Sequence, residues 1–484
     1  MSLQLRALAE REKRQRARNR ENGSPVYSFK QTYRDDPGSF VRDCIRWTKE
    51  EEPVFYQLDA LQSLAEHRRV SVRGPHGLGK TAMASWAILW FALTRDGEDW
   101  KIPTTASAWR QLTKFLWPEI RKWARRLDWQ KINYREPFNE RLELLSLSIK
   151  LQTGEAFALA SDNAAMIEGA HAQNLLYIFD EAKVIPPDTW DAAEGAFSTG
   201  DAYWLAISTP GEPNGRFYDI QSRRPGYDDW LTRHVTLQEA IAAGRISKEW
   251  AEQRRQQWGE ESAVYQNRVQ GEFATSEEDG IISLSRIEKA NERWLELQET
   301  DTWDPFTGQG VDVGRGGDKS VQALRHGWAI REIRRDNRRD VMPITGMTKS
   351  VLDAHPGSFA IIDVIGVGAG VVDRINEQGN YDVRPFNAGE RTDFHDRSGE
   401  LGFADKRSAA WWNMREILEN EPAALPPDDR LTGDLTAPRW RMTSGGKIKV
   451  ESKDDIKKRL GRSTDDGDAV VMAYWNEPQG VYFR

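Results

Sequence analysis

The stretch Gly74-Pro75-His76-Gly77-Leu78-Gly79-Lys80-Thr81 matches the pattern G-x-x-x-x-G-K-[ST], in which glycines let backbone N–H groups curl around phosphates. A short apolar strand, Arg69-Val70-Ser71-Val72, precedes it, and residues 80–93 predict a helix after it. The helix directs the positive end of its dipole toward the phosphates. We therefore predict an ATP site in which all eight residues bind the nucleotide. Lys80 reaches the β- and γ-phosphates, and the Thr81 hydroxyl binds Mg²⁺.

A second stretch, residues 175–181, supplies the carboxylates that such a site requires. It reads L-L-Y-I-F-D-E, which predicts a buried strand ending in two acids, Asp180 and Glu181. We expect Asp180 to hold Mg²⁺ through water and Glu181 to polarise the attacking water as the catalytic carboxylate. Ser208 and Thr209 end the next apolar strand, and their hydroxyls are placed to sense the γ-phosphate and to relay its loss.

Three further residues near this site have more than one interpretation. Gln57, upstream of the first strand, reads the adenine edge or is simply an exposed glutamine. Arg73, directly before the loop, joins the predicted nucleotide-binding residues. Arg73 and Arg216 are also candidates for the arginine that stabilises the transferring phosphoryl group. The sequence does not choose between them, nor does it exclude an arginine from a neighbouring subunit.

The length and composition describe a folded protein with several domains. At roughly 100–200 residues per domain, 484 residues suggest two or three, and alternating strands and helices indicate an α/β protein with a parallel sheet. A single cysteine excludes an internal disulfide framework and a Cys-based zinc site. We expect a charged arm and lead-in segment at residues 1–52, a P-loop ATPase domain at 53–274, a linker at 275–304 and a second α/β domain at 305–484.

The second domain carries acids on two strands and at the start of its last helix. Asp312 lies among apolar residues in one strand, and Asp363 ends the strand Ile361-Ile362-Asp363. A charge in such a position is costly unless it is paired or binds a metal. With the acids of residues 463–469, S-T-D-D-G-D-A, they provide the oxygen ligands of a two-metal phosphodiester-cleaving site. Mg²⁺ or Mn²⁺ would suit it, with two ions about 3.5–4 Å apart.

A rival interpretation concerns the glycine-rich stretch at residues 366–370, G-V-G-A-G, which follows the Asp363 strand. It has a superficial likeness to a dinucleotide-binding loop. However, it lacks the second G-x-x-G step, and an acidic residue precedes it, so the sequence disfavours nicotinamide binding.

Taken together and in this order, the motifs resemble those of the large terminase subunit of tailed bacteriophages. They read R-G-P-H-G-L-G-K-T, Y-I-F-D-E-A, I-S-T-P, G-V-D-V-G-R-G-G-D-K-S-V, I-I-D-V-I-G-V-G-A-G and S-T-D-D-G-D-A-V-V-M-A. Residues 250–273 also resemble the segment that this family carries before its nuclease domain. The resemblance implies a RecA-like ATPase domain of the additional-strand class and a ribonuclease H-like nuclease domain. It also implies the task of cutting concatemeric viral DNA and driving it into a procapsid.

The resemblance implies roles for individual residues as well. In the ATPase these are Lys80, Thr81, Asp180 and Glu181, with Ser208 and Thr209 in the coupling motif. In the nuclease the implied metal ligands are Asp312, Asp363 and Asp468, with Asp465 as a fourth acid and Asp318 and Asp466 as weaker candidates. The sequence departs from the family at Gly467, where an apolar residue is common, and it carries Arg315 in the first-strand glycine loop.

The resemblance further implies partners and cofactors. The partners are double-stranded DNA, the portal protein, the small terminase subunit and further copies of this chain in a ring, but no membrane. The protein would act in the cytoplasm of the infected bacterial host and transiently on the procapsid. ATP and Mg²⁺ are the implied cofactors, and Mn²⁺ would be able to substitute at the nuclease site.

Several points stay open at this level. The basic stretches at residues 110–126 and 325–339 are either DNA contacts or solvated faces. The alternative functions are a helicase or remodelling ATPase whose second domain does not cut, a packaging motor without nuclease activity, and a nucleotide-binding scaffold without turnover.

Overall fold

The strand before the phosphate loop, β1, lies inside a seven-stranded sheet of order β3-β4-β2-β5-β6-β1-β7. The computed structural model describes residues 25–106, 108–160, 167, 169–195, 197, 201–274, 279–314, 319–338 and 340–475. All neighbouring strands of the sheet are parallel except β3 and β4, which form an antiparallel pair. The strands are β1 (Arg69–Arg73), β2 (Trp100–Ala106), β3 (Ser148–Lys150), β4 (Gly154–Ala158), β5 (Asn174–Asp180), β6 (Asp201–Ser208) and β7 (Leu231–His234).

Strand β6 separates β1 from β5 and pairs with both. An extra strand between the phosphate-loop strand and the acidic strand is the RecA-like arrangement, so the fold-class prediction is confirmed for this sheet. Because these strands are parallel, the phosphate loop, Asp180 and Ser208 all lie at the same carboxyl edge, which is where open α/β sheets bind ligands.

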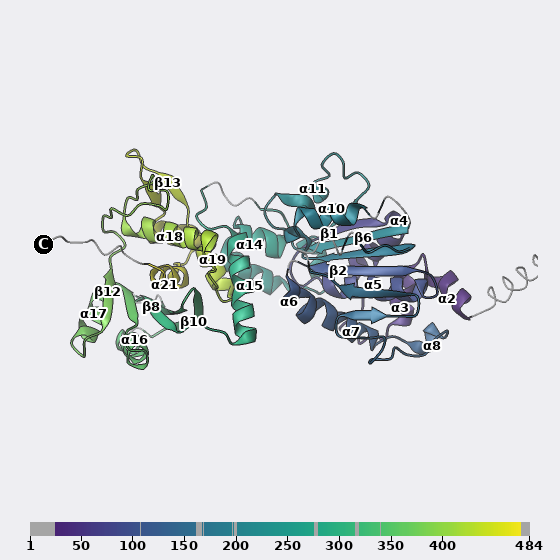
Figure 1. The fold of residues 1–484 in the computed structure, drawn as a ribbon. Helices are drawn as coiled ribbons and strands as arrows, with labels where there is room; N and C mark the ends of the chain where they lie inside the picture. The colour runs from purple at the N-terminus through teal and green to yellow at the C-terminus, as the bar shows by residue number, and fades with distance from the viewer. Residues whose placement is uncertain are drawn as a thin grey trace, which may run out of the picture. The chain divides into compact units, whose positions relative to one another are not determined.

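Helices cover both faces of this sheet. On one face Phe179 and Trp204 pack against Trp190 of helix α10, and on the other Tyr203 packs against Phe91 of helix α5. Helix α5 is apolar on all sides and buried after its first turn, as a helix in a protein interior must be. Figure 1 shows α10 and α11 on one side of the strands and α7 on the other. The helices and helical turns are α2 (Pro25–Tyr33), α3 (Pro37–Cys44), α4 (Phe55–His67), α5 (Lys80–Arg95), α6 (Trp109–Gln111), η1 (Leu112–Leu116), α7 (Trp117–Ala124), α8 (Trp129–Ile132), η2 (Ala182–Val184), α10 (Pro187–Gly195), α11 (Gly215–Gln221), α12 (Leu237–Ala242) and η4 (Gln266–Gln270).

A second sheet has five strands in the order β10-β9-β8-β11-β12. Strands β8, β9 and β10 are antiparallel neighbours, whereas β11 and β12 continue the sheet parallel to β8. This mixed order is the ribonuclease H-like arrangement, so the second half of the fold-class prediction is also confirmed. The strands are β8 (Phe306–Asp312), β9 (Ser320–His326), β10 (Ala329–Asp336), β11 (Phe359–Asp363) and β12 (Asp382–Phe386), with a separate hairpin of β13 (Trp440–Met442) and β14 (Ile448–Val450).

Helices pack on both faces of the second sheet. Val311 and Ile362 face a core that includes Ile344 of α16 and Val371 of α17, whereas Ile361 belongs to the core shared with α18 and α21. The helices are α13 (Lys248–Trp258), α14 (Ala263–Tyr265), α15 (Leu284–Thr300), α16 (Met342–Ala354), α17 (Gly368–Asn376), α18 (Lys406–Asn420), α19 (Asp429–Thr436), α20 (Lys453–Leu460) and α21 (Asp465–Ala473).

The chain divides into two compact units, whose boundaries differ from the predicted domains. Unit 1 comprises Met1–Lys248 with Asn267–Phe273, and unit 2 comprises Glu249–Gln266 with Ala274–Arg484. Residues 249–266, which we expected in the ATPase domain, therefore belong to unit 2. The range 275–304, expected as a linker, contains the 17-residue helix α15, which buries Ile287 in the core of unit 2.

Some sequence predictions fall outside the described residues. They are those for most of the charged arm (residues 1–24) and those for Arg315 and Asp318. Among the described residues, no helix combines the length and the apolar character needed to cross a membrane.

Helix α21 lies directly against strand β8. A Cβ atom at Gly310 would overlap the carbonyl oxygen of Ala469 in α21, so the strand and the helix approach closely only because this residue is glycine. Side chains two positions apart in a strand share a face. The side chain of Asp312 therefore points toward α21, as a side chain at position 310 would.

The close contact between β8 and α21 predicts that adding a single methyl group at position 310 destabilises unit 2. We expect Gly310→Ala to lower the free energy of unfolding of unit 2 by about 1–3 kcal/mol, because the added methyl group overpacks a backbone contact. The matched control is Gly346→Ala in helix α16, where a Cβ meets no atom within 4 Å. It should raise stability by up to about 1 kcal/mol through helix propensity. Thermal unfolding of both variants measures the difference, and equal melting temperatures would contradict the close packing of α21.

Candidate active sites

The phosphate loop has the backbone that its glycines predicted. Gly77 and Gly79 take φ angles of 81° and 73°, a region that glycine occupies without steric cost. The Lys80 Nζ donates a hydrogen bond to the carbonyl oxygen of Pro75 at 2.7 Å, so the ammonium group lies over the loop. Burial lowers the pKa of Lys80 to about 8, although two nearby carboxylates oppose this change. A half-buried cation over a glycine loop is suited to bind a polyphosphate.

The predicted carboxylates meet the loop from the neighbouring strands. The Thr81 hydroxyl donates to Asp180 Oδ2 at 3.5 Å, which places the two predicted Mg²⁺ ligands together. Burial and the adjacent Glu181 charge raise the pKa of Asp180 to about 7. Glu181 has a left-handed backbone (φ 49°, ψ 48°), which is rare for a residue other than glycine and typical of functional sites. Its Oε2 accepts hydrogen bonds from Ser208 Oγ at 3.1 Å and Thr209 Oγ1 at 3.4 Å.

A cavity of about 560 Å³ opens above these residues. The phosphate loop, Glu181 and Thr209 line one side, and the segment from η1 to α7 contributes Lys114, Phe115 and Lys122. Phe115 is 48% exposed although it is a large apolar residue. Part of the basic stretch at residues 110–126 therefore borders the candidate nucleotide cavity.

The structure gives Gln57 a different place from the one we expected. Its side chain is 1% exposed, and its Nε2 donates to the carbonyl oxygens of Leu78 and Gly79, both at 3.1 Å. Its Oε1 accepts the N–H of Val54 at 3.0 Å. Because both ends of the amide are engaged, Gln57 supports the phosphate loop and is neither an adenine reader nor an exposed glutamine.

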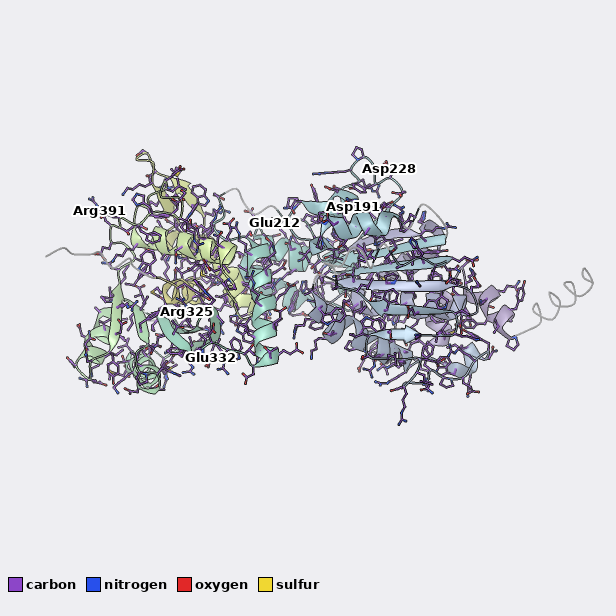
Figure 2. All side chains as sticks on the ribbon, in the orientation of Figure 1. Asp191, Glu212, Asp228, Arg325, Glu332 and Arg391 are labelled. Carbon is purple, nitrogen blue, oxygen red and sulfur yellow. The ribbon has the colours of Figure 1, made fainter. Side chains whose placement is uncertain are left out.

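Neither candidate arginine lines the nucleotide cavity. Arg73 donates to the carbonyl oxygen of Gly271 at 2.8 Å and pairs with Glu272. Arg216 pairs with Asp191 at 2.5 Å, and Figure 2 labels Asp191 on helix α10. The guanidinium groups of both arginines are thus held by other parts of unit 1, which disfavours either one as the phosphoryl-stabilising arginine in this conformation.

The segment Asn267–Phe273 explains why Arg73 is held in this way. It packs on the phosphate loop, where the N–H of His76 donates to the carbonyl oxygen of Arg268 at 3.0 Å. A Cβ at Gly271 would lie 2.6 Å from Pro75 Cδ, so only glycine allows this approach. Asn267 Nδ2 donates to the carbonyl oxygen of Gly211, in the loop that follows strand β6, at 3.2 Å. This segment therefore contacts both the phosphate loop and the loop after β6.

In unit 2, three predicted metal ligands converge on a residue that the sequence analysis did not identify. The Lys453 Nζ lies 2.9 Å from Asp312 Oδ2, 3.1 Å from Asp465 Oδ1 and 3.6 Å from Asp468 Oδ2. Burial alone would lower the pKa of Lys453, but the three carboxylates raise it well above its ordinary value. Burial raises the pKa of Asp312, and the two other acids add to this effect.

Asp468 has three further hydrogen-bond partners besides Lys453. Its Oδ1 accepts hydrogen bonds from Arg407 Nη1 at 2.5 Å and Trp411 Nε1 at 3.1 Å, and its Oδ2 accepts one from Thr464 Oγ1 at 3.0 Å. Although burial opposes it, Arg407 and Lys453 hold the pKa of Asp468 below its usual range. Arg407 is a second residue of this site that carried no signal in the sequence.

Asp363 joins the same site through a cavity of about 360 Å³, which it lines with Arg407, Lys453 and Asp468. Burial raises its pKa, and its Oδ1 accepts the N–H of Ile365 at 2.9 Å. Gly368 allows the chain to pack closely here, because a Cβ at this position would overlap the Asp363 carbonyl oxygen.

Asp466 lies apart from this cluster. Its Oδ2 accepts hydrogen bonds from Arg335 Nε at 2.8 Å and Nη2 at 2.6 Å. Arg325 is also held internally, since it donates to the carbonyl oxygen of Ala473 at 3.1 Å, and Figure 2 labels it near α21. Two arginines of the basic stretch at residues 325–339 therefore support helix α21 from within unit 2.

The donor chemistry suits a divalent cation, but the present geometry favours an ammonium group. Carboxylates of Asp312, Asp363, Asp465 and Asp468 are the ligands that Mg²⁺ and Mn²⁺ prefer. In the described part of the chain, however, no group of three or more His, Cys, Asp or Glu side chains has the arrangement of a metal-ligand set. Lys453 sits among three of these acids, so a metal ion would have to displace its ammonium group.

No protein-family model matches the chain. A curated relative, described as a probable terminase, large subunit, of Enterobacteria phage P7, is 24% identical over 445 residues and covers 87% of each chain. This chain is similar to large terminase subunits. The match confirms the resemblance that the motifs indicated.

Two solved structures of large terminases were also matched. The large terminase of a thermophilic bacteriophage in complex with ADP is 14% identical, with 86% of this chain and 97% of that chain covered and a TM-score of 0.40. The nuclease domain of the large terminase subunit of bacterial virus Sf6 is 18% identical, with 41% of this chain and 99% of that chain covered and a TM-score of 0.36.

The position of Gln57 leads to a test of its role. We expect Gln57→Leu to lower kcat/KM for ATP and for GTP equally, by about 10- to 30-fold, because two hydrogen bonds to the loop are lost. The ratio of the two nucleotides should stay as in the wild type. Gln62→Leu on the same helix is the control. A changed ATP-to-GTP ratio in steady-state hydrolysis would restore Gln57 as an adenine reader.

The position of Lys453 leads to a second test. In EDTA, Lys453→Met should lower the free energy of unfolding of unit 2 by about 3 kcal/mol, because three buried carboxylates lose their cation. Mn²⁺ should then raise the melting temperature of the variant more than that of the wild type, since the metal no longer competes with the ammonium group. Lys349→Met, at an exposed ion pair on α16, is the control. Equal Mn²⁺ responses would show that the acids do not form one cation site.

Proposed function

We propose that this chain is the large subunit of a viral DNA-packaging motor. It would hydrolyse ATP to drive double-stranded DNA into a procapsid and would cut concatemeric genome DNA with a two-metal endonuclease. The observation that carries the proposal is the presence of two separate clusters in one chain, each of which combines buried acids with a half-buried lysine. One cluster lies at the phosphate loop, and the other lies around Lys453.

For ATP hydrolysis, the proposal assigns each residue a task from its contacts. Lys80 and the loop amides bind the β- and γ-phosphates, and Thr81 and Asp180 hold Mg²⁺, which neutralises phosphate charge when bound. Glu181 orients the attacking water and accepts its proton. The hydroxyls of Ser208 and Thr209 hold the Glu181 carboxylate, so a shift of this carboxylate on γ-phosphate loss moves the end of β6.

For DNA cleavage, the proposed metal ligands are Asp312, Asp363, Asp465 and Asp468. Two bound ions would supply the activated water and the stabilisation of the leaving oxygen. Arg407 keeps Asp468 ionised and oriented, and its Nη2 is buried without a hydrogen-bond partner among the described residues. Lys453 balances the charge of the acids before metal binds. Once metal ions displace its ammonium group from the acids, that group would be available to pair with a backbone phosphate of the DNA.

The remaining parts of the proposal follow from the likeness to a probable large terminase subunit. The partners are double-stranded DNA, the portal protein, the small terminase subunit and other copies of this chain in a ring. ATP and Mg²⁺ are the cofactors, and Mn²⁺ replaces Mg²⁺ at the nuclease site. The protein acts in the cytoplasm of the infected host and transiently on the procapsid.

Two variants should separate the activities. Lys80→Ala should abolish ATP hydrolysis, because the lysine that binds the β- and γ-phosphates is lost. It should leave Mn²⁺-dependent plasmid cleavage intact, because Lys80 lies in unit 1 and the proposed nuclease ligands lie in unit 2. Asp363→Ala should do the reverse. Lys131→Ala and Asp353→Ala, at exposed positions of the two units, are the matched controls. Wild-type protein that separates DNA strands but never cuts them would favour the helicase alternative, and protein with neither activity would favour the scaffold.

A further inference from the structure

The first turn of helix α21 carries two of the proposed nuclease ligands but has no cap from its own sequence. Asp465 and Asp468 lie in this turn, and every residue of the helix is buried. The side chain of Thr464, at the N-cap position, accepts no capping hydrogen bond, and its hydroxyl donates to Asp468. The first N–H groups of a helix lack partners within the helix, and a buried N–H group needs one.

Asp434 supplies these partners from a distant part of the chain. It lies on helix α19 and is 0% exposed. Its Oδ2 accepts the N–H of Asp466 at 3.0 Å and the N–H of Gly467 at 3.3 Å. A carboxylate in this position also interacts favourably with the positive end of the helix dipole. Asp434 thus performs, from another helix, the role that an N-cap residue has in most helices.

Arg462 fixes the orientation of the Asp434 carboxylate. Its guanidinium pairs with Asp434 Oδ1, while its Nε donates to the carbonyl oxygen of Gln257 at 2.6 Å and its Nη1 to that of Ser463 at 3.1 Å. Trp258 Nε1 also donates to the carbonyl oxygen of Asp429 at 2.9 Å, at the start of α19. The end of α13 therefore anchors both the arginine and the helix that carries Asp434.

Gly467 is the residue that lets Asp434 come so close. A Cβ at this position would lie 3.1 Å from Asp434 Cβ and 3.1 Å from Trp411 Cη2, which is tighter than ordinary van der Waals contact. A larger residue would push α21 away from α19.

We propose that Asp434 and Arg462 are positioning residues of the nuclease, and that the absence of a side chain at Gly467 leaves the room that Asp434 occupies. The pair holds the first turn of α21 at the rotation and height that bring Asp465 and Asp468 to the same point as Asp312. Neither residue of the pair lines the cavity that Asp363, Lys453 and Asp468 share. This inference rests on the proposed endonuclease activity.

The test compares the metal dependence of DNA cleavage in full-length variants. Asp434→Asn keeps the size of the side chain but removes the charge that Arg462 and the helix end require. We expect a loss of about 10- to 100-fold in kcat together with a higher half-saturating Mn²⁺ concentration, as for residues that orient metal ligands. KM for DNA and the ATP hydrolysis rate should be unchanged. Asp353→Asn, at an exposed ion pair in unit 2, is the matched control.

Gly467→Ala is the second variant, because it adds one methyl group and removes no polar group. It should raise the half-saturating Mn²⁺ concentration in the same direction, and it decides the question if Asp434→Asn does not fold. Folded variants that cleave with the Mn²⁺ dependence of the wild type would overturn the inference and leave the proposed function standing. Wild-type protein that does not cleave DNA would instead overturn the proposed function.

Discussion

Three buried carboxylates share one ammonium group in unit 2, and the structure around them depends on that balance of charge. Asp312, Asp465 and Asp468 are each nearly inaccessible to solvent, and their mutual repulsion would be severe without a cation. Lys453 supplies it at 2.9–3.6 Å. The same arrangement of acids is what a divalent metal site requires. The lysine therefore offsets the repulsion among these acids and occupies the position between them that a divalent cation would need.

Unit 1 also brings acids and a cation together, but around the phosphate loop. Lys80 is the half-buried cation, and Asp180 and Glu181 are the acids at the carboxyl end of strand β5. Here the ammonium group also donates to the carbonyl oxygen of Pro75, which holds it over the phosphate loop. In this position it is suited to bind a phosphate. Glu181 has a strained backbone that two hydroxyls from the end of β6 support. In both units the charged groups gather where several elements end, because each element delivers one or two of them.

Much of this could be predicted from residue patterns, and the failures have physical causes. The phosphate loop and the strands ending at Asp180 and Asp363 are predictable, because short-range periodicity and glycine spacing determine them. The prediction of a linker at 275–304 is wrong, because the range contains helix α15. The charged residues of this helix outnumber the few apolar residues that it buries, such as Ile287, so its apolar face is hard to recognise in the sequence. The prediction for Gln57 also differs from the structure, in which its side chain donates to two carbonyl oxygens of the phosphate loop. Nothing in the sequence around Gln57 indicates this contact.

The sequence by itself determined which chemical groups are present, in what order, and on which strands and helices they lie. It also carried the resemblance to large terminase subunits, because motif order survives when overall identity is low. Only the tertiary structure decided which groups meet. Lys453 and Asp312 are 141 residues apart in the chain, and Arg407 and Asp468 are 61 apart. No local pattern encodes such contacts, because they depend on how each sheet packs with its covering helices, and the desolvation that makes these charges functional arises only from that packing.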